Sequence, residues 1–499
     1  MKPSDSFSHV QPRKLSSTAL CGCLLMAFLL LCFMTLIKSS CSNASTTSVM
    51  KLQLSIYKNV SLFSPEESMA EQVGLNANPS LSFEEAQVSD APIEDESLPM
   101  ESLDNKSRVV CDFTGENSDT CWIDGDIRVV GELSTVILAS PPIDNSNQTE
   151  NRTWKIRPYT RKFEPATQQL IKEITVTAAE FAPLAPPRCM INHSVPALFF
   201  STGGFVGNYF HDFSDVIIPL FMTGRRFNGQ VQFVVSDFNH HFIDKYQPIL
   251  KRLSHYPAIN LDADDRVHCF PHAHVGLLSH KVLGIDSSRS PNGVSMPDFR
   301  DLLRTSFSLE RSYSKGLVLE QSKNASKPKA LLILRKGSRS FINEAPVMST
   351  LEGIGLELIT AGPEEAKNLS GFAKMVNSVD VLIGVHGAGL TNMLFLPANA
   401  TLVQIVPCCG LKAGCRYLFA DPAPDMGIRY VDYEIRDEES SLIELYPRDD
   451  AVFKDPLSIQ KRPGFFDFWN IYLNQQKIKL DVDRFKTTML SHILQSTKT

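Results

Sequence analysis

LLILRKGSRSFINE (Leu331–Glu344) and VLIGVHGAGLTNMLFLP (Val381–Pro397) decide the fold expected for this chain. Each segment begins with a short apolar run typical of a buried strand and then breaks into a polar or glycine-rich turn. In a parallel α/β sheet, ligands bind where such strands end. We therefore expect both turns to open on one crevice.

The two turns carry groups suited to a diphosphate. Arg335 and Arg339 stand four residues apart, so a helical turn would project them from one face, and guanidinium groups bind oxyanions bidentately. Gly387 and Gly389 let the backbone approach a ligand closely, and the amides of Ala388 to Thr391 would open a helix with its positive end toward an anion. Taken singly, each motif also fits surface arginines or a tight turn. Their joint occurrence favours a nucleotide-diphosphate site.

These motifs resemble glycosyltransferase family 61. The resemblance rests on HGAGLTN and on a preceding Arg-x-x-x-Arg-x-x-x-Asn-Glu segment (Arg335, Arg339, Asn343, Glu344), within a likeness that runs from about Val109 to about Ile435. The family includes plant xylan arabinosyl- and xylosyltransferases, the plant N-glycan β-1,2-xylosyltransferase and animal O-linked N-acetylglucosaminyltransferases. It implies that the segment binds a nucleotide sugar, with His386 on phosphate or sugar, and Thr391 and Asn392 lining the nucleotide pocket.

Residues 108–179 are expected to form a β-rich opening of strands joined by turns, and beyond it short buried strands alternate with helices on both sides of a polar stretch. The second half is expected to run strand 330–336, helix 344–354, strand 356–361, helix 363–379, strand 380–385, helix 389–395, strand 401–407 and, further on, strand 429–435. Such alternation predicts a doubly wound parallel sheet. The fold class is therefore α/β and GT-B-like, with two doubly wound Rossmann-like lobes. We expect an acceptor lobe (108–310), a linker (311–329) and a nucleotide-sugar lobe (330–499) that closes with a terminal helix.

The first 107 residues differ from the rest. Residues 1–18 read as a cytosolic tail, the uncharged run 19–37 as a transmembrane signal anchor, and 38–107 as a disordered stem. A cleaved signal peptide is the less favoured alternative, since the run is long. Nine sequons follow the run: Asn43, Asn59, Asn105, Asn147, Asn151, Asn192, Asn324, Asn368 and Asn399. They favour a type II protein of the Golgi membrane with a lumenal body.

Composition limits the partners. Eleven acidic and no basic residues lie between Ser61 and Asp104, so the rest of the chain is mildly basic despite a net charge of -6. This suits an anionic donor and falls short of a nucleic-acid-binding surface. Seven cysteines lie beyond residue 107, and in an oxidising lumen we expect disulfides, with Cys111–Cys121 as the clearest pair. The adjacent Cys408 and Cys409, and Cys415, depart from the family pattern.

The first lobe offers a candidate base in STGGFVGNYFHDFSDVIIPLF (Ser201–Phe221). His211 and Asp215 stand four apart, so on a helix they share a face, and an imidazole oriented by a carboxylate can deprotonate a sugar hydroxyl. A capping arrangement with a structural histidine is the alternative. The family's Asn-x-x-His-x-x-x-Asp pattern matches Asn208, His211 and Asp215 and favours function. Asp212 is the second candidate base, and Gly203 and Gly204 form a turn beside it.

Other glycosyltransferases hold a metal ion with a D-x-D motif, and two segments of this chain must be compared with it. Asp124–Asp126 and Asp262–Arg266 match the letters of a D-x-D motif, but neither follows a buried strand before a nucleotide site, and we interpret both as turns. Arg335, Arg339 and the helix start at Ala388 would neutralise the leaving diphosphate, so no metal and no other cofactor is predicted.

The sequence thus predicts an inverting glycosyltransferase that transfers xylose or arabinofuranose from a UDP-sugar to a xylan-type polysaccharide. It is anchored by one membrane span, and a complex with other Golgi glycosyltransferases is possible. Transfer of N-acetylglucosamine to protein, transfer of xylose to N-glycans, and an inactive glycan-binding scaffold are the alternatives.

Overall fold

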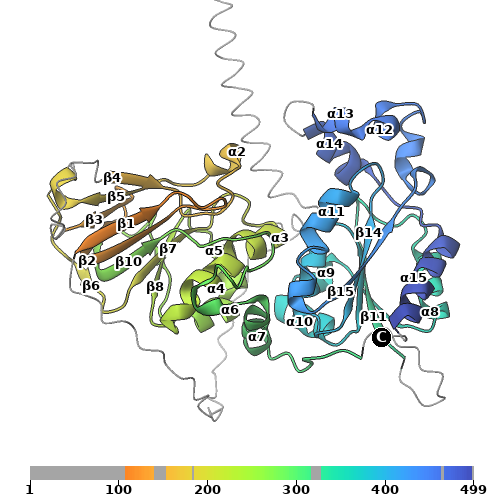
Figure 1. The fold of residues 1–499 in the computed structure, drawn as a ribbon, viewed down its shortest axis with the longest axis horizontal. Coiled ribbons are helices and arrows are strands. Elements are labelled where there is room, and N and C mark those ends of the chain that lie inside the picture. The colour runs from red at the N-terminus through yellow and green to blue at the C-terminus, as the bar shows by residue number, and fades with distance from the viewer. Residues whose placement is uncertain (1–106, 140–152, 183–184, 316–326, 462–465, 497–499) are drawn as a thin grey trace, which may run out of the picture. The chain divides into compact units, whose positions relative to one another are not determined.

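A computed structural model describes residues 107–139, 153–182, 185–315, 327–461 and 466–496 (Figure 1). All of them belong to the structural unit Phe63–Thr499. The predicted cytosolic tail, membrane span and, apart from residue 107, the stem lie outside these residues. Among the helices that are described, none combines the length and the apolar character needed to cross a membrane.

The first lobe is built on a ten-stranded mixed sheet. Eight strands follow the order β4-β5-β3-β2-β10-β7-β8-β9, while β1 pairs with β2 and β6 with β10. The strands are β1 (Arg108–Asp112), β2 (Thr120–Val130), β3 (Thr135–Leu138), β4 (Thr153–Ile156), β5 (Ile174–Ala178), β6 (Ile191–Asn192), β7 (Ala197–Ser201), β8 (Gln232–Ser236), β9 (Ile259–Asn260) and β10 (Val267–Val275).

The prediction of a doubly wound first lobe is therefore wrong for its opening half. β2 pairs antiparallel with β1, β3 and β10, and β4 pairs antiparallel with β5. β10, β7, β8 and β9 form a run of parallel neighbours, and β3 pairs parallel with β5. Burial explains the difference, because β2 alternates between buried and more exposed positions whereas all residues of β7 and β8 are buried. A strand covered on both faces suits a parallel sheet, and an alternating strand suits an antiparallel one.

Helices of the first lobe mostly follow its parallel strands. After β7 the chain forms one continuous helical stretch with a π-helical turn at its centre, composed of α3 (Tyr209–His211), η2 (Asp212–Ile217) and α4 (Ile218–Gly224). The other helices are α2 (Pro165–Gln168), η1 (Ala179–Phe181), η3 (Arg225–Phe227), α5 (His240–Lys245), α6 (Gln247–Leu253), η4 (Pro291–Gly293) and α7 (Met296–Phe307).

The second lobe contains the parallel sheet that the sequence predicts. Its strand order is β12-β11-β13-β14-β15, and every neighbouring pair is parallel. Leu331, Leu382 and Leu402 stand in register on one face, and Leu332, Ile383 and Val403 on the other. The strands are β11 (Lys329–Ile333), β12 (Glu357–Ala361), β13 (Val381–Val385), β14 (Thr401–Val406) and β15 (Arg429–Glu434).

Helices cover both faces of this sheet, as Figure 1 shows. Residues of α10 share an apolar cluster with one face, while α8 and α15 share a second cluster with the other. The helices are α8 (Glu344–Gly353), α9 (Pro363–Ala366), α10 (Leu369–Asn377), η5 (Ala388–Phe395), α11 (Lys412–Phe419), η6 (Pro424–Met426), η7 (Asp437–Glu439), η8 (Ser441–Glu444), α12 (Ala451–Lys454) and α13 (Pro456–Gln460). A mixed α/β chain with parallel sheets fits a Rossmann-like glycosyltransferase.

The predicted single terminal helix is broken in the structure. It consists of α14 (Phe466–Trp469), the π-helical η9 (Asn470–Gln475) and α15 (Val482–Ser496), with an extended segment at residues 476–481 between them. Ile478 in that segment pairs with Phe341 and with Ser440. The side chain of Asp481 accepts a hydrogen bond from the amide of Arg484 and thereby starts α15 as a cap.

The lobes share buried contacts. A single apolar cluster includes Phe213 of the first lobe and Phe395 of the second, whose rings lie 6.1 Å apart. Arg300 of α7 donates to the carbonyls of Met426 and Leu396. Of the predicted linker, residues 316–326 lie outside the described part, and Arg311 before them pairs with Asp380 of the second lobe at 2.6 Å.

The predicted Cys111–Cys121 disulfide is present, and Cys189–Cys269 and Cys408–Cys409 are two further bridges. Cys415 is a buried free cysteine. Among the predicted glycosylation sites, Asn192 and Asn368 are exposed, and Asn399 is half-buried. The other six lie outside the described residues.

Candidate functional site

Arg335 and Arg339 lie in the turn that follows β11. This turn is not helical as predicted, because Gly337 and Arg339 both have left-handed backbone angles, with φ of +85° and +56°. Arg335 is buried, and its Nε donates to the carbonyl of Ser338 at 3.1 Å. Arg339 donates through Nη1 to the carbonyl of His386 at 2.8 Å.

The two guanidinium groups converge on Gly387, the residue after His386. A Cβ atom at Gly387 would lie 2.7 Å from Nη1 of Arg335 and 3.1 Å from Nη1 of Arg339, and the glycine has φ of +152°. Glycine is therefore required here both for its backbone angle and for the space. β11 and β13 are neighbours in the sheet, and the strand order reverses at β11. The convergent cations thus lie at the position where sheets of this type bind ligands.

His386 is held as a neutral imidazole. Its Nδ1 accepts from Nε2 of Gln404 at 2.7 Å, and Oε1 of Gln404 in turn accepts from the hydroxyl of Tyr430 at 2.6 Å. Burial, and then the charges of Arg339 and Arg335, lower the pKa of His386 to about 3. The neutral ring therefore carries its proton on Nε2, which makes that nitrogen a hydrogen-bond donor beside the arginine pair.

The turn continues into η5, which is a 3₁₀-helix rather than the predicted α-helix. Ala388 and Gly389 begin it, so their amides belong to its positively polarised first turn, as do those up to Thr391. Thr391 is fully buried. Asn392 is also buried, and its Oδ1 accepts from the hydroxyl of Tyr209 in the first lobe at 2.9 Å.

Asn343 and Glu344 are not brought to the arginine pair by any contact in the described part of the chain. The side chain of Asn343 donates to the carbonyl of Leu480 at 2.8 Å and accepts from the Leu480 amide at 2.9 Å. Glu344 is exposed in the first turn of α8. The geometry thus gives Asn343 a structural task, which is to hold the segment between η9 and α15.

His211 and Asp215 form the predicted pair in the first lobe. Nδ1 of His211 lies 2.8 Å from Oδ2 of Asp215, which also accepts from Nε of Arg161 at 2.7 Å and from the hydroxyl of Tyr159 at 3.0 Å. The pair sits where α3 passes into the π-helical turn η2. Such turns frequently occur at functional sites.

The charges of this cluster determine which ring nitrogen of His211 carries the proton. Burial alone would raise the pKa of Asp215, but His211 and Arg161 outweigh it and lower the pKa. Burial raises the pKa of Tyr159, and Asp215 adds to the rise, so the phenol remains a donor. An ionised carboxylate only accepts hydrogen bonds, so His211 must place its proton on Nδ1. Nε2 is then the basic nitrogen.

The other first-lobe candidates have structural roles in this geometry. Asp212, the second candidate base, is 1% exposed and accepts from the amide of Gly207 at 2.8 Å and from the hydroxyl of Tyr246 at 2.7 Å. Asn208 caps α3 through the Phe210 amide. A Cβ at Gly204 would lie 2.9 Å from the Tyr159 ring, and one at Gly203 would lie 3.1 Å from Cβ of Asp237. Gly204 thus allows close packing against Tyr159, and Gly203 allows it against Asp237.

A cavity of about 640 Å³ lies between the two lobes. Asn208 and Tyr209 line it from the first lobe, and Ala388, Gly389 and Asn392 from the second. His211 and the arginine pair are not among the lining residues. Phe419 lies between the two clusters, since its ring is 5.7 Å from that of Phe210, the neighbour of His211, and 5.7 Å from that of His386.

Both aspartate motifs are engaged with other side chains. Asp124 accepts from Arg108 and His272, and Asp126 pairs with Arg128. These two residues lie inside β2, so the prediction of a turn at Asp124–Asp126 is wrong.

The second motif does form a turn, between β9 and β10, as predicted. There Asp262 pairs with Lys172, and Asp264 with Arg266.

Sequence reasoning missed four residues of these two clusters. Tyr159 and Arg161 lie in the loop that follows β4, which ends at Ile156. Gln404 lies inside the apolar strand β14, and Tyr430 lies in the half-buried strand β15. A glutamine within the run TLVQIV is the one signal that could have indicated a buried polar partner.

The fold and these clusters define the chain as a two-lobed α/β protein with a cationic turn at the switch point of a parallel sheet. Residues 209–403 match the family described as Glycosyltransferase 61. The alpha-1,3-arabinosyltransferase XAT3 of Oryza sativa subsp. japonica is 41% identical over 406 residues, which is 81% of this chain and 68% of that protein. The chain thus spans about two thirds of the length of this relative.

Two further relatives are covered more fully. The beta-1,2-xylosyltransferase XYXT1 of Oryza sativa subsp. japonica is 40% identical over 77% of this chain and 84% of its own length. The xylan glycosyltransferase MUCI21 of Arabidopsis thaliana is 34% identical over 92% of this chain and 94% of its own length. The chain belongs to glycosyltransferase family 61, and it is an enzyme that transfers a sugar.

Proposed function

We propose that this enzyme transfers a pentose, xylose or arabinofuranose, from a UDP-sugar to a xylan-type polysaccharide with inversion at the anomeric carbon. The observation that carries the proposal is the convergence of Arg335 and Arg339 on Gly387, because two guanidinium groups over a glycine turn match the oxygens of a diphosphate. The neutral His386 adds a donor on Nε2 to the same site.

The names of the relatives support the acceptor and the two donors. XAT3 is named an arabinosyltransferase, XYXT1 a xylosyltransferase, and MUCI21 a xylan glycosyltransferase. Identities of 41% to XAT3 and 40% to XYXT1 favour neither pentose. The donor is therefore the first variable to test.

In the proposed reaction, Nε2 of His211 takes the proton from an acceptor hydroxyl while the oxygen forms a bond to the anomeric carbon of the donor sugar. The bond from that carbon to the diphosphate breaks, and UDP leaves with the electron pair. Arg335 and Arg339 stabilise the charge that develops on the leaving group. Asp215 orients His211 and stabilises the imidazolium that forms.

We also propose that the reaction needs no metal ion. The two arginines and the amides at the start of η5 supply positive charge where a metal would otherwise act. Asp124, Asp126, Asp262 and Asp264 have basic partners of their own. This arrangement supports transfer that survives chelation.

We further propose a type II protein of the Golgi membrane with its body in the lumen. The apolar run 19–37 and the nine sequons after it support this topology. Exposure of Asn192 and Asn368, together with the three disulfides, fits a glycosylated and oxidised body.

The test is donor-dependent release of UDP by the full-length protein in a mild detergent. UDP-xylose, UDP-arabinofuranose and UDP-N-acetylglucosamine are each offered with xylan oligosaccharides, with and without EDTA. We expect xylan-dependent turnover of one pentose donor, unchanged by EDTA. Turnover with N-acetylglucosamine alone would refute the substrate, loss of turnover in EDTA would refute the metal-free mechanism, and UDP binding without turnover on any donor would favour a scaffold.

A further inference from the structure

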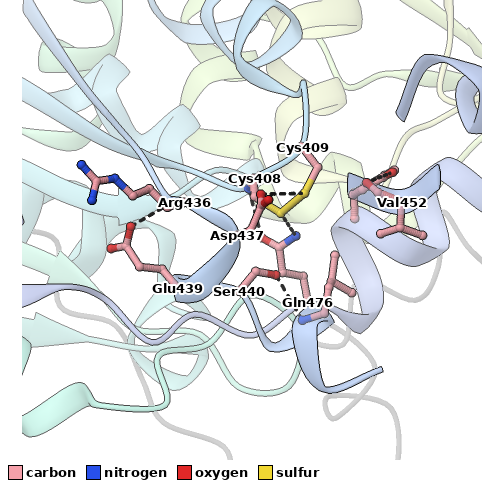
Figure 2. The surroundings of a disulfide bond; sticks show 10 residues. Cys408, Cys409, Arg436, Asp437, Glu439, Ser440, Val452 and Gln476 are labelled. Carbon is pink, nitrogen blue, oxygen red and sulfur yellow. Dashed lines mark hydrogen bonds between the residues drawn. A yellow bond between two sulfur atoms is a disulfide. The ribbon is translucent and has the colours of Figure 1, made fainter. Parts of the chain in front are cut away.

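Two adjacent cysteines, Cys408 and Cys409, form a disulfide directly after β14 (Figure 2). β14 is the neighbour of β13, the strand that leads into His386 and Gly387. The disulfide therefore stands at the same edge of the sheet as the proposed diphosphate site. The catalytic scheme above gives it no role.

Gln476 connects this disulfide to its surroundings. The Gln476 side chain is fully buried, with Oε1 accepting from the Cys408 amide at 3.3 Å and Nε2 lying 3.5 Å from Sγ of Cys408. Figure 2 shows the amide directed at the disulfide. Because a buried amide needs hydrogen-bond partners, the position of Gln476 depends on the position of Cys408.

Gln476 also holds the backbone of Arg339. Its carbonyl accepts from the Arg339 amide at 2.6 Å, and two residues further on Ile478 pairs with Phe341. The extended segment after η9 thus runs beside the arginine turn. Gln476 therefore contacts the disulfide through its side chain and Arg339 through its main chain.

Arg339 needs such support. Its φ of +56° lies in the left-handed region, which costs a residue other than glycine about 1–2 kcal/mol. Its side chain donates to the His386 carbonyl. With the main chain fixed by Gln476 and the head fixed by His386, the guanidinium points at Gly387.

The disulfide also restricts the backbone turn at Cys409 and Gly410. Cys409 and Gly410 have consecutive left-handed angles, with φ of +74° and +82°. A covalent bond between the side chains of adjacent residues restricts the backbone of both. Cys409 is half-buried and Gly410 is exposed, so a small reductant can reach the bond.

We propose that the Cys408–Cys409 disulfide, acting through Gln476, positions Arg339 for the donor diphosphate, so that donor affinity depends on the oxidation state of this pair. The inference rests on the proposed function of Arg339. The chemical change is a two-electron reduction, in which a dithiol reductant becomes a cyclic disulfide and the protein gains two thiols. The cysteines are positioning residues, since neither needs to touch the substrate.

The experiment compares oxidised protein, dithiothreitol-treated protein and the Cys408→Ser/Cys409→Ser variant, all full length. UDP affinity is measured by calorimetry, KM and kcat are measured for the active donor, and thiols are counted by mass spectrometry. Reduction or replacement should weaken UDP binding by about threefold to tenfold, the worth of one neutral hydrogen bond, and leave kcat within about twofold. The matched control is Cys111→Ser/Cys121→Ser, which removes a first-lobe disulfide and should leave UDP affinity unchanged.

Gln476→Leu separates positioning from general stability. In the oxidised protein it should weaken UDP binding by a similar factor, and reduction should then add little, because both changes break one chain of contacts. Equal UDP affinity in oxidised and reduced protein, or independent and additive effects of Gln476→Leu and reduction, would overturn the proposal. If the serine pair fails to fold, the treated wild type gives the answer; if the bond resists reduction, the serine pair gives it. Full UDP affinity in Arg339→Ala would instead refute the diphosphate site itself.

Discussion

Gly387→Ala should damage the donor site far more than the fold. The new Cβ would lie 2.7 Å from Nη1 of Arg335 and 3.1 Å from Nη1 of Arg339. Both atoms are the ends of long side chains, so the fold can adapt when they move. The site cannot, because the same atoms are the proposed phosphate ligands. The backbone angles of Gly387, φ +152° and ψ 179°, lie in a region open essentially to glycine alone, so a side chain there adds about 1–3 kcal/mol of strain.

The magnitude follows from the hydrogen bonds at risk. A hydrogen bond that involves a charged group contributes about 1.5–3 kcal/mol. Displacement of Arg335, the closer of the two, should therefore cost at least one such bond to the diphosphate. This corresponds to UDP binding that is about 10-fold to 150-fold weaker.

The assay is calorimetric titration of UDP, paired with thermal unfolding of the same preparations. Gly353→Ala, at the end of α8, makes the same chemical change into open space and should leave UDP affinity unchanged. In an Arg335→Ala background the Gly387→Ala change should cost little, because the displaced group is already absent. Unaltered UDP affinity in a folded Gly387→Ala protein would refute the assignment of Arg335 and Arg339 as ligands of the diphosphate.

Three further predictions address other contacts. Arg161→Gln should lower kcat by about tenfold or more and move the acidic limb of the pH–rate profile upward. Without the positive charge of Arg161, the Asp215 carboxylate keeps a proton on the His211–Asp215 pair to higher pH; an unmoved limb would exclude this role. Tyr209→Phe should cost about 0.5–1.5 kcal/mol in denaturant unfolding, since it removes the hydrogen bond to Asn392 between the lobes. The His386 pKa of about 3 lies below its unfolded value of about 6.5, so stability should be fully present above pH 6.5 and fall toward pH 3 by up to about 1.4 kcal/mol per pH unit. His386→Gln should reduce that slope, and His274, whose pKa burial also lowers to about 3, should leave part of it.

The second lobe could be predicted strand by strand because its signals are local. β11, β13 and β14 are short, largely apolar runs, each followed by a helix, and every strand from β11 to β15 lies beside a strand that is close to it in the chain or one crossover away. The first lobe was harder, since β2 pairs with β10 far along the sequence. Pairing direction across such a distance is set by tertiary packing, which no local pattern records.

The same distinction separates the site residues that were found from those that were missed. Arg335, Arg339 and Gly387 follow strand ends, and the rule that ligands bind there was enough to group them. Arg161 lies in a loop after β4 and reaches Asp215 only in the folded chain. Asn343 was placed in the donor site by its neighbours in sequence, whereas its partner Leu480 belongs to a segment near the C-terminus.

The two halves of the proposed reaction lie on different lobes, yet short rigid elements join them. Tyr209 belongs to α3, which ends at His211, and its hydroxyl donates to Asn392 of η5, which begins directly after Gly387. Phe210 of α3 packs on Phe419, and His386 packs on the same ring. The distance between His211 and the arginine pair is therefore set by packed side chains rather than by a loop. Changes at Tyr209 should consequently affect kcat more than UDP affinity, since Arg335, Arg339 and Gly387 all belong to the second lobe.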